Sequence, residues 1–383
     1  MDRVFAEIDR LYEEYIGFWA DICNIESPTS FKEGVDAVGA YVAEKARAQG
    51  WDVEINEQKE AGNAVCITMN GNATKAPVCL SAHMDTVHPV GSFGTPAVRI
   101  ADGKIYGPGV TDCKGGIASA FLAMRALKEC GYTDRPVKLI LQSDEELSSL
   151  PSGKSTVDFM ARCAKGCVAF LNGEPSDEDF SRLVIERKGI IRFILDVKGI
   201  AAHSSICYDG ASAVLEAAHK VIELDRFRDK DGLTSNCGII RGGKAANSVP
   251  DECEITVDFR YKTPEQRDEA VAAVEKAAST VHVEGTSCTW RIKSERTSMP
   301  LCERNRELVR KINEIYSLYG MLTANGASSR GGSDAADMTV RGIPSVDCIG
   351  TAGARIHSTD EYGVLESLKG SAKRQAAIIV NIE

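Results

Sequence analysis

Apolar positions in the first part of the chain follow two alternating patterns. In residues 1–22 they return every three or four positions, which predicts an amphipathic helix. Continuous apolar runs at 76–82, 136–143 and 166–172 are typical of strands buried on both faces. Between the first two runs, a helical pattern at 114–131 ends in glycine. Strand, helix and strand in this order predict an α/β domain with a mostly parallel sheet.

The pattern changes in the middle of the chain. Strand-like alternation at 188–199, 253–261 and 287–295 is interleaved with helical patterns at 210–227 and 263–279. After this region, a helical pattern at 305–320 and a continuous apolar run at 343–350 are again typical of an α/β domain. We therefore expect one α/β domain built from residues 1–188 and 297–383. It is interrupted by an inserted α+β domain of the ferredoxin-like type at 189–296.

Composition narrows the class of protein. The 383 residues are 43% hydrophobic and 26% charged, which is ordinary for a globular protein, and the net charge of -10 argues against nucleic acid or an anionic membrane as the main partner. The thirteen cysteines are scattered and include no C-x-x-C pair, which favours reduced thiols. No export signal and no stretch of about 20 apolar residues is visible, so we expect a soluble cytoplasmic protein.

Acidic residues and histidines follow the predicted strands, where ligands of open α/β sheets bind. They are His83 and Asp85 after the first strand, Asp144, Glu145 and Glu146 after the second, Glu174 after the third, His357, Asp360 and Glu361 after the last, and Asp112 in a glycine-rich turn. A single such acid is most often a solvated loop residue. Parallel strands, however, end on one side of the sheet, so these groups should cluster.

A cluster of this many carboxylates needs a cation to offset its self-repulsion. Two imidazoles with several carboxylates suit Zn²⁺, with Co²⁺ or Mn²⁺ as substitutes, and a shared carboxylate suits two metal ions. Of the consecutive pair Glu145 and Glu146, one can bind metal while the other faces the substrate as a general base. The remaining histidines, His88, His219 and His282, have no partner in this pattern and are interpreted as incidental.

Eight short segments resemble, in order, the motifs of one enzyme family. They are SAHMDTV, GPGVTDCKGG, SDEE, NGEPS, KGIAAHSS, AANSVPDECEITVDFR, GGSDAAD and GTAGARIHSTDEY. The family is that of the di-zinc metallopeptidases, which includes bacterial glutamate carboxypeptidases, acetylornithine deacetylase, succinyl-diaminopimelate desuccinylase and aminoacylase. Each segment alone is a weak signal, whereas eight in the family's order are highly specific. The resemblance implies that the α/β domain is catalytic and that the inserted domain is a lid or dimerisation domain.

The resemblance also implies the roles of individual residues. It implies two Zn²⁺ ions with five protein ligands: His83 and Glu174 on one ion, Glu146 and His357 on the other, and Asp112 bridging them. Asp85 would accept the second ring N–H of His83 and fix its tautomer. Glu145 would take a proton from the water between the metals and pass it to the leaving amine. The bond between Asp112 and Cys113 would be cis, and the cysteine itself is a departure from the family pattern.

Further implied residues lie in or near the inserted domain. His203 would stabilise the developing oxyanion, usually across a dimer interface. Asn247 and Arg260 would contact the carboxylate end of the substrate, as would backbone amides of the loop 330–337, which begins with Arg330 and Gly331. The resemblance thus implies a homodimer that acts on a small molecule or peptide with a free carboxylate.

These residues lead to an expected activity and three alternatives. We expect hydrolysis of an amide bond next to a free carboxylate, releasing a C-terminal amino acid such as glutamate. An N-acyl amino acid deacylase, such as an acetylornithine deacetylase or aminoacylase, shares nearly all of these motifs. A non-catalytic carboxylate-binding protein on the same fold is an alternative of another class, disfavoured because Glu145 is present. A thiol enzyme that uses Cys113 is the third.

Overall fold

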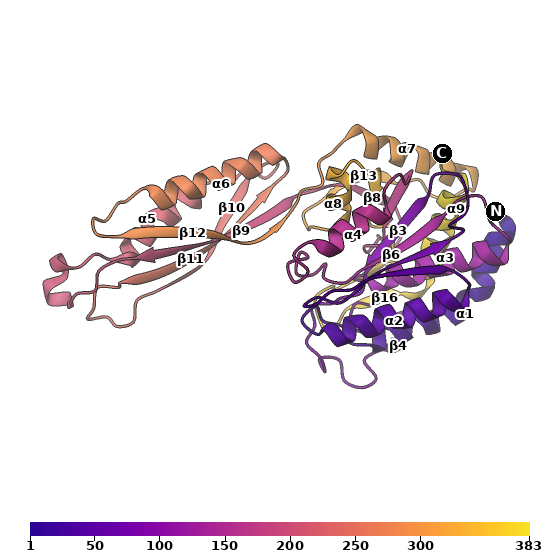
Figure 1. Cartoon of the computed structure of the whole chain (residues 1–383), viewed down its shortest axis with the longest axis horizontal. Coiled ribbons are helices and arrows are strands. Elements are labelled where there is room, and N and C mark those ends of the chain that lie inside the picture. Colours follow the sequence, from indigo (N-terminus) through magenta and orange to yellow (C-terminus); the bar gives the residue numbers. More distant parts are fainter. The chain divides into compact units, whose positions relative to one another are not determined.

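The computed structural model describes residues 1–383, which form two compact units (Figure 1). The first unit contains Met1–Glu186, Leu301–Ser328 and Ser333–Glu383, and the second contains Arg187–Pro300 and Ser329–Gly332. Both ends of the inserted unit thus fall outside the expected range of 189–296. None of the helices has the length and apolar character that a membrane crossing requires.

The first unit is built around a six-stranded sheet in the order β1-β2-β6-β3-β7-β14. The strands are β1 (Asp52–Asn56), β2 (Ala64–Met69), β6 (Val137–Gln142), β3 (Val78–His83), β7 (Ala169–Asn172) and β14 (Ser345–Val346). The last four in this order are parallel to one another, while β1 and β2 pair antiparallel at one edge. The predicted mostly parallel sheet is therefore confirmed.

Helices cover both faces of this sheet. The larger core contains residues of α1 (Asp2–Asn24), α2 (Lys32–Ala48), α3 (Lys114–Glu129), α7 (Glu303–Leu318) and α9 (Leu365–Asn381). The smaller core lies under α4 (Ser155–Cys163) and α8 (Asp334–Val340). Along β3, Val78 and Leu80 enter the larger core while Cys79 enters the smaller one. This alternation explains the continuous apolar run, because side chains of a strand point in turn to two buried faces.

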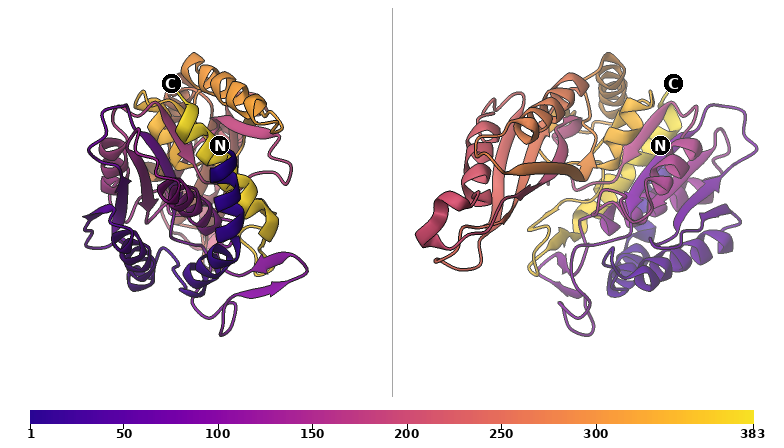
Figure 2. Two further views of the ribbon diagram at one scale, coloured as in Figure 1. Left: turned by 90° about the vertical axis from the view of Figure 1, so that its right-hand side faces the viewer. Right: turned by 60° about the vertical axis from the view of Figure 1, so that its left-hand side comes forward.

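Small sheets complete the first unit. A second four-stranded sheet has the order β15-β16-β5-β4, made of β15 (Gly353–Ala354), β16 (Tyr362–Val364), β5 (Lys104–Tyr106) and β4 (Arg99–Ala101). The β4–β5 hairpin projects from the body of the unit (Figure 2, left). Two further strands, β8 (Arg182–Arg187) and β13 (Asn325–Ser329), form a two-stranded sheet.

The second unit is an antiparallel sheet with two helices. Its order is β10-β11-β9-β12, with β9 (Gly189–Lys198), β10 (Thr234–Gly242), β11 (Glu252–Tyr261) and β12 (Ser287–Arg296). The helices α5 (Ala213–Leu224) and α6 (Pro264–Ser279) pack on one core with these strands. A short 3-10 helix, η1 (Ser204–Asp209), precedes α5. The chain order of strand, helix, two strands, helix and strand confirms the ferredoxin-like arrangement.

The last predicted strand is shorter than its apolar run at 343–350. Only Ser345 and Val346 form β14. The chain leaves the sheet where the Asp347 carboxylate accepts hydrogen bonds from Asn172 Nδ2 (3.1 Å) and its neighbour's backbone N–H (2.7 Å), and Cys348 adopts a φ of 64°. A positive φ is incompatible with an extended strand. All thirteen cysteines are free, as their scatter predicted.

Candidate active site

Asp112 lies between two histidines, and each carboxylate oxygen faces one of them. Asp112 Oδ1 is 3.1 Å from His83 Nε2, and Oδ2 is 3.2 Å from His357 Nε2. His357 Nε2 is also 3.3 Å from Glu146 Oε2. His83 ends β3 and Glu146 lies in the turn after β6, so both sit at carboxyl ends of parallel strands. The structure therefore brings these four predicted ligands together.

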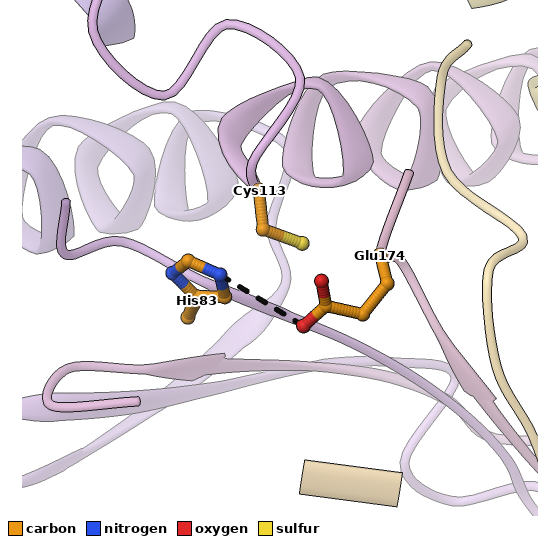
Figure 3. Close-up of side chains that lie close together, drawn as sticks. All are labelled: His83, Cys113 and Glu174. Carbon is orange, nitrogen blue, oxygen red and sulfur yellow. Dashed lines mark ion pairs between the residues drawn. The ribbon is translucent and has the colours of Figure 1, made fainter. Parts of the chain in front are cut away.

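Glu174 lies close to His83 on one side of the cluster, and the thiol of Cys113 lies beside them (Figure 3). His83 Nε2 is 3.8 Å from Glu174 Oε1. The Cys113 side chain also points toward these two residues, and ligand atoms of the three lie within 4.8 Å of one another. Its thiol donates a hydrogen bond to the Gly173 carbonyl at 3.0 Å. The sequence placed Cys113 directly after Asp112 and raised it as a possible nucleophile, but it did not predict that the thiol would lie close to both His83 and Glu174. The expected cis bond between Asp112 and Cys113 is present.

The donor set fits metal cations. The ion pairs within it join imidazoles with carboxylates and include no lysine or arginine. Without a metal, burial raises the pKa of Glu146 to about 7 and raises that of Glu174 well above its ordinary value of 4.5. Hydrogen bonds to Asp112 and Glu146 raise the pKa of His357 to about 10. Buried carboxylates that resist ionisation become stable anions once divalent cations replace these protons.

The carboxylate of Asp85 holds the turn that carries Glu145 and Glu146. Its Oδ1 accepts a hydrogen bond from the backbone N–H of Glu145, and its Oδ2 accepts one from that of Glu146, both at 3.1 Å. The Thr29 hydroxyl donates to Oδ2 at 2.7 Å. The nearest oxygen to His83 Nδ1 is the backbone carbonyl of Asp85 at 2.9 Å, whereas its carboxylate is 3.4 Å away. The Asp85 carboxylate thus orients the glutamate pair more directly than it orients the ring of His83.

Glu361 performs a similar task for Asp112. Its buried carboxylate accepts hydrogen bonds from the backbone N–H of Thr111 (2.9 Å), Asp112 (3.0 Å) and Gly109 (3.4 Å). It therefore joins the segment of His357 to the glycine-rich turn of Asp112. The sequence analysis placed Glu361 among the acids after the last strand but assigned it no role, although its position four residues after the proposed ligand His357 was a usable signal.

His88 was interpreted as incidental, and in the structure its buried Nε2 has no hydrogen-bond partner. It is buried, and its Nε2 lies 3.6 Å from Glu361 Oε2. His219 and His282 belong to the second unit, where their rings stack at 4.6 Å.

Two acids of the predicted rim turn away from the cluster. Asp144 is buried, and it accepts hydrogen bonds from the backbone N–H of Ser152 (2.9 Å) and the hydroxyl of Thr156 (2.7 Å) at the start of α4. Asp360 is exposed and pairs with Arg355 at 3.2 Å. Side chains of neighbouring residues in a turn point in different directions. The position of an acid after a strand therefore does not by itself identify it as a metal ligand.

The predicted substrate-binding residues and His203 all belong to the second unit. His203 is exposed and precedes η1, where its Nδ1 accepts a hydrogen bond from the Ser205 backbone N–H at 3.2 Å. Arg260 lies on β11 and pairs with Asp258 at 2.6 Å. Asn247, Arg330 and Gly331 are exposed. These residues therefore belong to a different unit from the cluster of candidate metal ligands, whose members are all in the first unit.

Known proteins resemble the chain over nearly its whole length. Carboxypeptidase G2 of Pseudomonas sp. (strain RS-16) is 26% identical over 367 residues, which cover 94% of this chain and 87% of that protein. Acetylornithine deacetylase of Myxococcus xanthus is 28% identical over 367 residues, which cover 89% of this chain and 90% of that protein. The two relatives carry the names of different activities, so the similarity does not choose between a carboxypeptidase and a deacetylase.

Solved structures share the fold. The aminopeptidase PepT of Bacillus cereus has a TM-score of 0.79 at 23% identity, with 96% of this chain and 98% of that chain covered. A metallo-carboxypeptidase of Sulfolobus solfataricus has a TM-score of 0.75 at 17% identity, with 96% of this chain and 99% of that chain covered. The model of peptidase family M20/M25/M40 matches residues 79–381, a range that contains the whole cluster around Asp112. The chain is therefore a hydrolytic enzyme that belongs to peptidase family M20/M25/M40.

Proposed function

We propose that the chain is a two-zinc hydrolase that cleaves an amide bond next to a free carboxylate and releases a C-terminal amino acid such as glutamate. The observation that carries this proposal is the position of Asp112, with one oxygen toward His83 and the other toward His357. A carboxylate shared in this way suits two cations, and nitrogen and oxygen donors suit Zn²⁺, with Co²⁺ or Mn²⁺ as substitutes. Glu174 and His83 would hold one ion, and Glu146 and His357 would hold the other.

Glu145 is the residue we assign as general base. Two bound cations would polarise the scissile carbonyl and acidify the attacking water. Glu145 is mostly buried beside the ligand Glu146, and Asp85 fixes the backbone N–H groups of both residues. In this role its carboxylate takes a proton from the attacking water and delivers it to the leaving nitrogen. General bases contribute about 10²–10⁴-fold to such rates.

The second unit is assigned the recognition of substrate. We assign His203 to the developing oxyanion, and the carboxylate of the substrate to Asn247, Arg260 and the backbone at Arg330 and Gly331. The planar guanidinium of Arg260 suits a carboxylate. It already pairs with one, Asp258, at 2.6 Å, which the substrate would replace.

A homodimer through the second unit is part of the proposal. Helix α5 exposes Leu215 (52%) and Ile222 (73%), seven residues apart and therefore on one face of the helix. Strand β10 is an edge strand whose Ile240 is 50% exposed. Exposed apolar side chains beside an unpaired sheet edge favour a protein interface. We further propose a cytoplasmic location, which the thirteen free cysteines support.

Metal removal and a substrate panel test the activity. Enzyme purified with zinc, treated with EDTA and then reloaded with Zn²⁺ or Co²⁺, is assayed on N-acyl amino acids, dipeptides and acyl-glutamates. Activity should disappear with the metal and return on reloading, with acyl-glutamates cleaved fastest. Full activity in metal-free protein would refute the metal mechanism. Faster cleavage of N-acetylornithine or other N-acetyl amino acids would select the deacylase alternative, which the Myxococcus xanthus relative represents.

Substitution of Glu145 separates the base from the ligands. Glu145→Gln should lower kcat by about 10²-fold or more while the zinc content, measured by mass spectrometry, remains that of the unaltered enzyme. Glu178→Gln, at an exposed position, serves as the control. Zinc loss in Glu145→Gln would instead identify Glu145 as a ligand. Tight binding of candidate amides without turnover by the unaltered zinc enzyme would favour the non-catalytic alternative.

A further inference from the structure

The four-stranded sheet β15-β16-β5-β4 of the first unit carries cations stacked on aromatic rings. The guanidinium of Arg99 on β4 lies 3.9 Å from the ring centroid of Tyr106 on β5, and the ammonium of Lys104 lies 4.0 Å from that of Tyr362 on β16. Tyr106 and Tyr362 are paired in register, with ring centroids 5.9 Å apart. The four side chains therefore form one continuous platform.

A cavity of about 570 Å³ lies over this platform. Its wall also contains Phe93, Pro96 and Ala97, which are apolar, and Arg355. Asp360 is the one acid of the lining, and it pairs with Arg355. The lining thus holds three cations against one carboxylate, in a chain with 55 acidic and 45 basic residues. Neither Arg99 nor Lys104 forms an ion pair, so both charges are available to a ligand.

The platform presents these charges in a fixed geometry. A guanidinium stacked on a ring keeps its in-plane N–H donors free for the two oxygens of a carboxylate. The stacked position also restricts a side chain that would otherwise lose rotamer freedom on binding. The apolar wall around Phe93 suits the hydrocarbon part of the same ligand. The lining has more charged side chains than an ordinary small-molecule pocket, and three of them are cations beside the apolar Phe93, Pro96 and Ala97. This combination suits an anion with an apolar body.

We propose that this cavity is a binding site for a small organic anion, in which Arg99 and Lys104 hold one or two carboxylates and Phe93 contacts an aromatic body. The site is distinct from the metal centre, because none of its lining residues is among the proposed ligands. Some of its lining residues are nevertheless close to proposed ligands in the sequence. Arg355 and Thr359 lie two residues on either side of His357, and the Phe93 ring packs edge-on against His88 at 4.9 Å.

Calorimetric titration with isophthalate tests the proposal, and its uncharged analogue isophthalamide is the ligand control. Zinc-loaded and EDTA-treated protein should both bind isophthalate with a Kd of about 1 mM or tighter and should bind isophthalamide much more weakly. The double variant Arg99→Gln, Lys104→Gln should lose at least about tenfold in affinity, since it removes both charge-assisted contacts. Arg47→Gln, an exposed arginine on α2, should bind as the unaltered protein does.

Three results would overturn the site. They are no detectable binding at about 10 mM isophthalate, equal affinity in the double variant, and binding only when zinc is present, which would place the anion on the metals. If the double variant does not fold, Arg99→Lys replaces it, because lysine keeps the charge but lacks the planar fork. That variant should weaken isophthalate binding, and an unchanged Kd would contradict the proposal. The measurement needs no catalytic activity, so its failure is distinct from failure of the proposed function.

Discussion

The Glu361 carboxylate accepts a hydrogen bond from the backbone N–H of Asp112 at 3.0 Å, and so fixes the residue that lies between the two imidazoles. The same carboxylate accepts one from the Thr111 N–H at 2.9 Å. Two segments that are about 250 residues apart in the chain thereby hold each other in place. Asp112 is a proposed metal ligand, and loss of a group that orients a metal ligand typically lowers metal affinity about 10–100-fold.

Glu361→Gln should therefore weaken zinc binding about 10–100-fold. The amide nitrogen cannot accept a hydrogen bond, and the neutral side chain no longer attracts the N–H groups of the turn. Competition with a chromophoric chelator measures the zinc Kd. Asp360→Asn is the matched control, because Asp360 is exposed and pairs with Arg355. Equal zinc affinity in Glu361→Gln and the unaltered enzyme would refute this positioning role.

Asp85→Asn should lower kcat more than it lowers zinc content. Its two carboxylate oxygens accept from the backbone N–H groups of Glu145 and Glu146, and an asparagine has one acceptor oxygen. One buried N–H would lose its partner, at a cost of about 1–3 kcal/mol, and the turn that carries the proposed base would shift. Thr29→Val removes only the hydroxyl that donates to Asp85 and should have a smaller effect. Steady-state kinetics gives kcat for each variant, and metal analysis gives its zinc content. An unchanged kcat in Asp85→Asn would contradict the expectation.

Cys113→Ser should keep most of the activity. The thiol is fully buried and donates to the Gly173 carbonyl, an interaction that a hydroxyl can replace. Burial raises the pKa of Cys113 well above its ordinary value of 9.0, which opposes the thiolate that a nucleophile requires. Hydrolysis rates of the serine variant at matched zinc content provide the measurement. Cys207→Ser, at an exposed position, is the control, and loss of turnover in Cys113→Ser alone would revive the thiol mechanism.

Glu216→Gln should destabilise the second unit in a pH-dependent way. The buried Glu216 carboxylate accepts hydrogen bonds from Lys220 Nζ (2.7 Å) and from the backbone N–H groups of His282 (2.9 Å) and Val283 (2.7 Å). Burial alone would raise its pKa, but these bonds outweigh burial and lower the pKa below its ordinary value of 4.5. A lowered pKa stabilises the fold above 4.5, and this stabilisation is lost as the pH falls through the folded-state pKa.

Thermal unfolding at several pH values measures this contribution. At pH 7, loss of one partner of a buried ion pair costs about 3–5 kcal/mol, so the variant should melt at a clearly lower temperature. The difference from the unaltered protein should shrink as the pH falls from 4.5, where the unfolded chain takes up the proton, toward the lower folded-state pKa of Glu216. Glu275→Gln, on the exposed side of α6, should melt as the unaltered protein does. A difference that stays constant down to pH 3 would contradict the assigned charge state.

The sequence by itself determined the parallel sheet and the position of the cluster. Buried strands read as continuous apolar runs because both of their faces are covered, and Val78 and Cys79 point into opposite cores. Residues that follow such strands must meet at one edge, which is why His83, Asp112 and His357 were predicted to lie together. The ferredoxin-like second unit followed from its order of strand and helix patterns.

Only the tertiary structure decided which polar groups serve the cluster and which serve the fold. Asp144 and Glu146 follow the same strand, yet one accepts hydrogen bonds at the start of α4 and the other faces His357. The direction of a side chain in a turn depends on backbone angles that no apolar pattern encodes. Glu361 accepts its hydrogen bond from Asp112, and lies near His88, through contacts between segments far apart in the chain. The platform of Arg99 and Tyr106 likewise exists because strand pairing places them side by side, and pairing register is a property of the folded sheet.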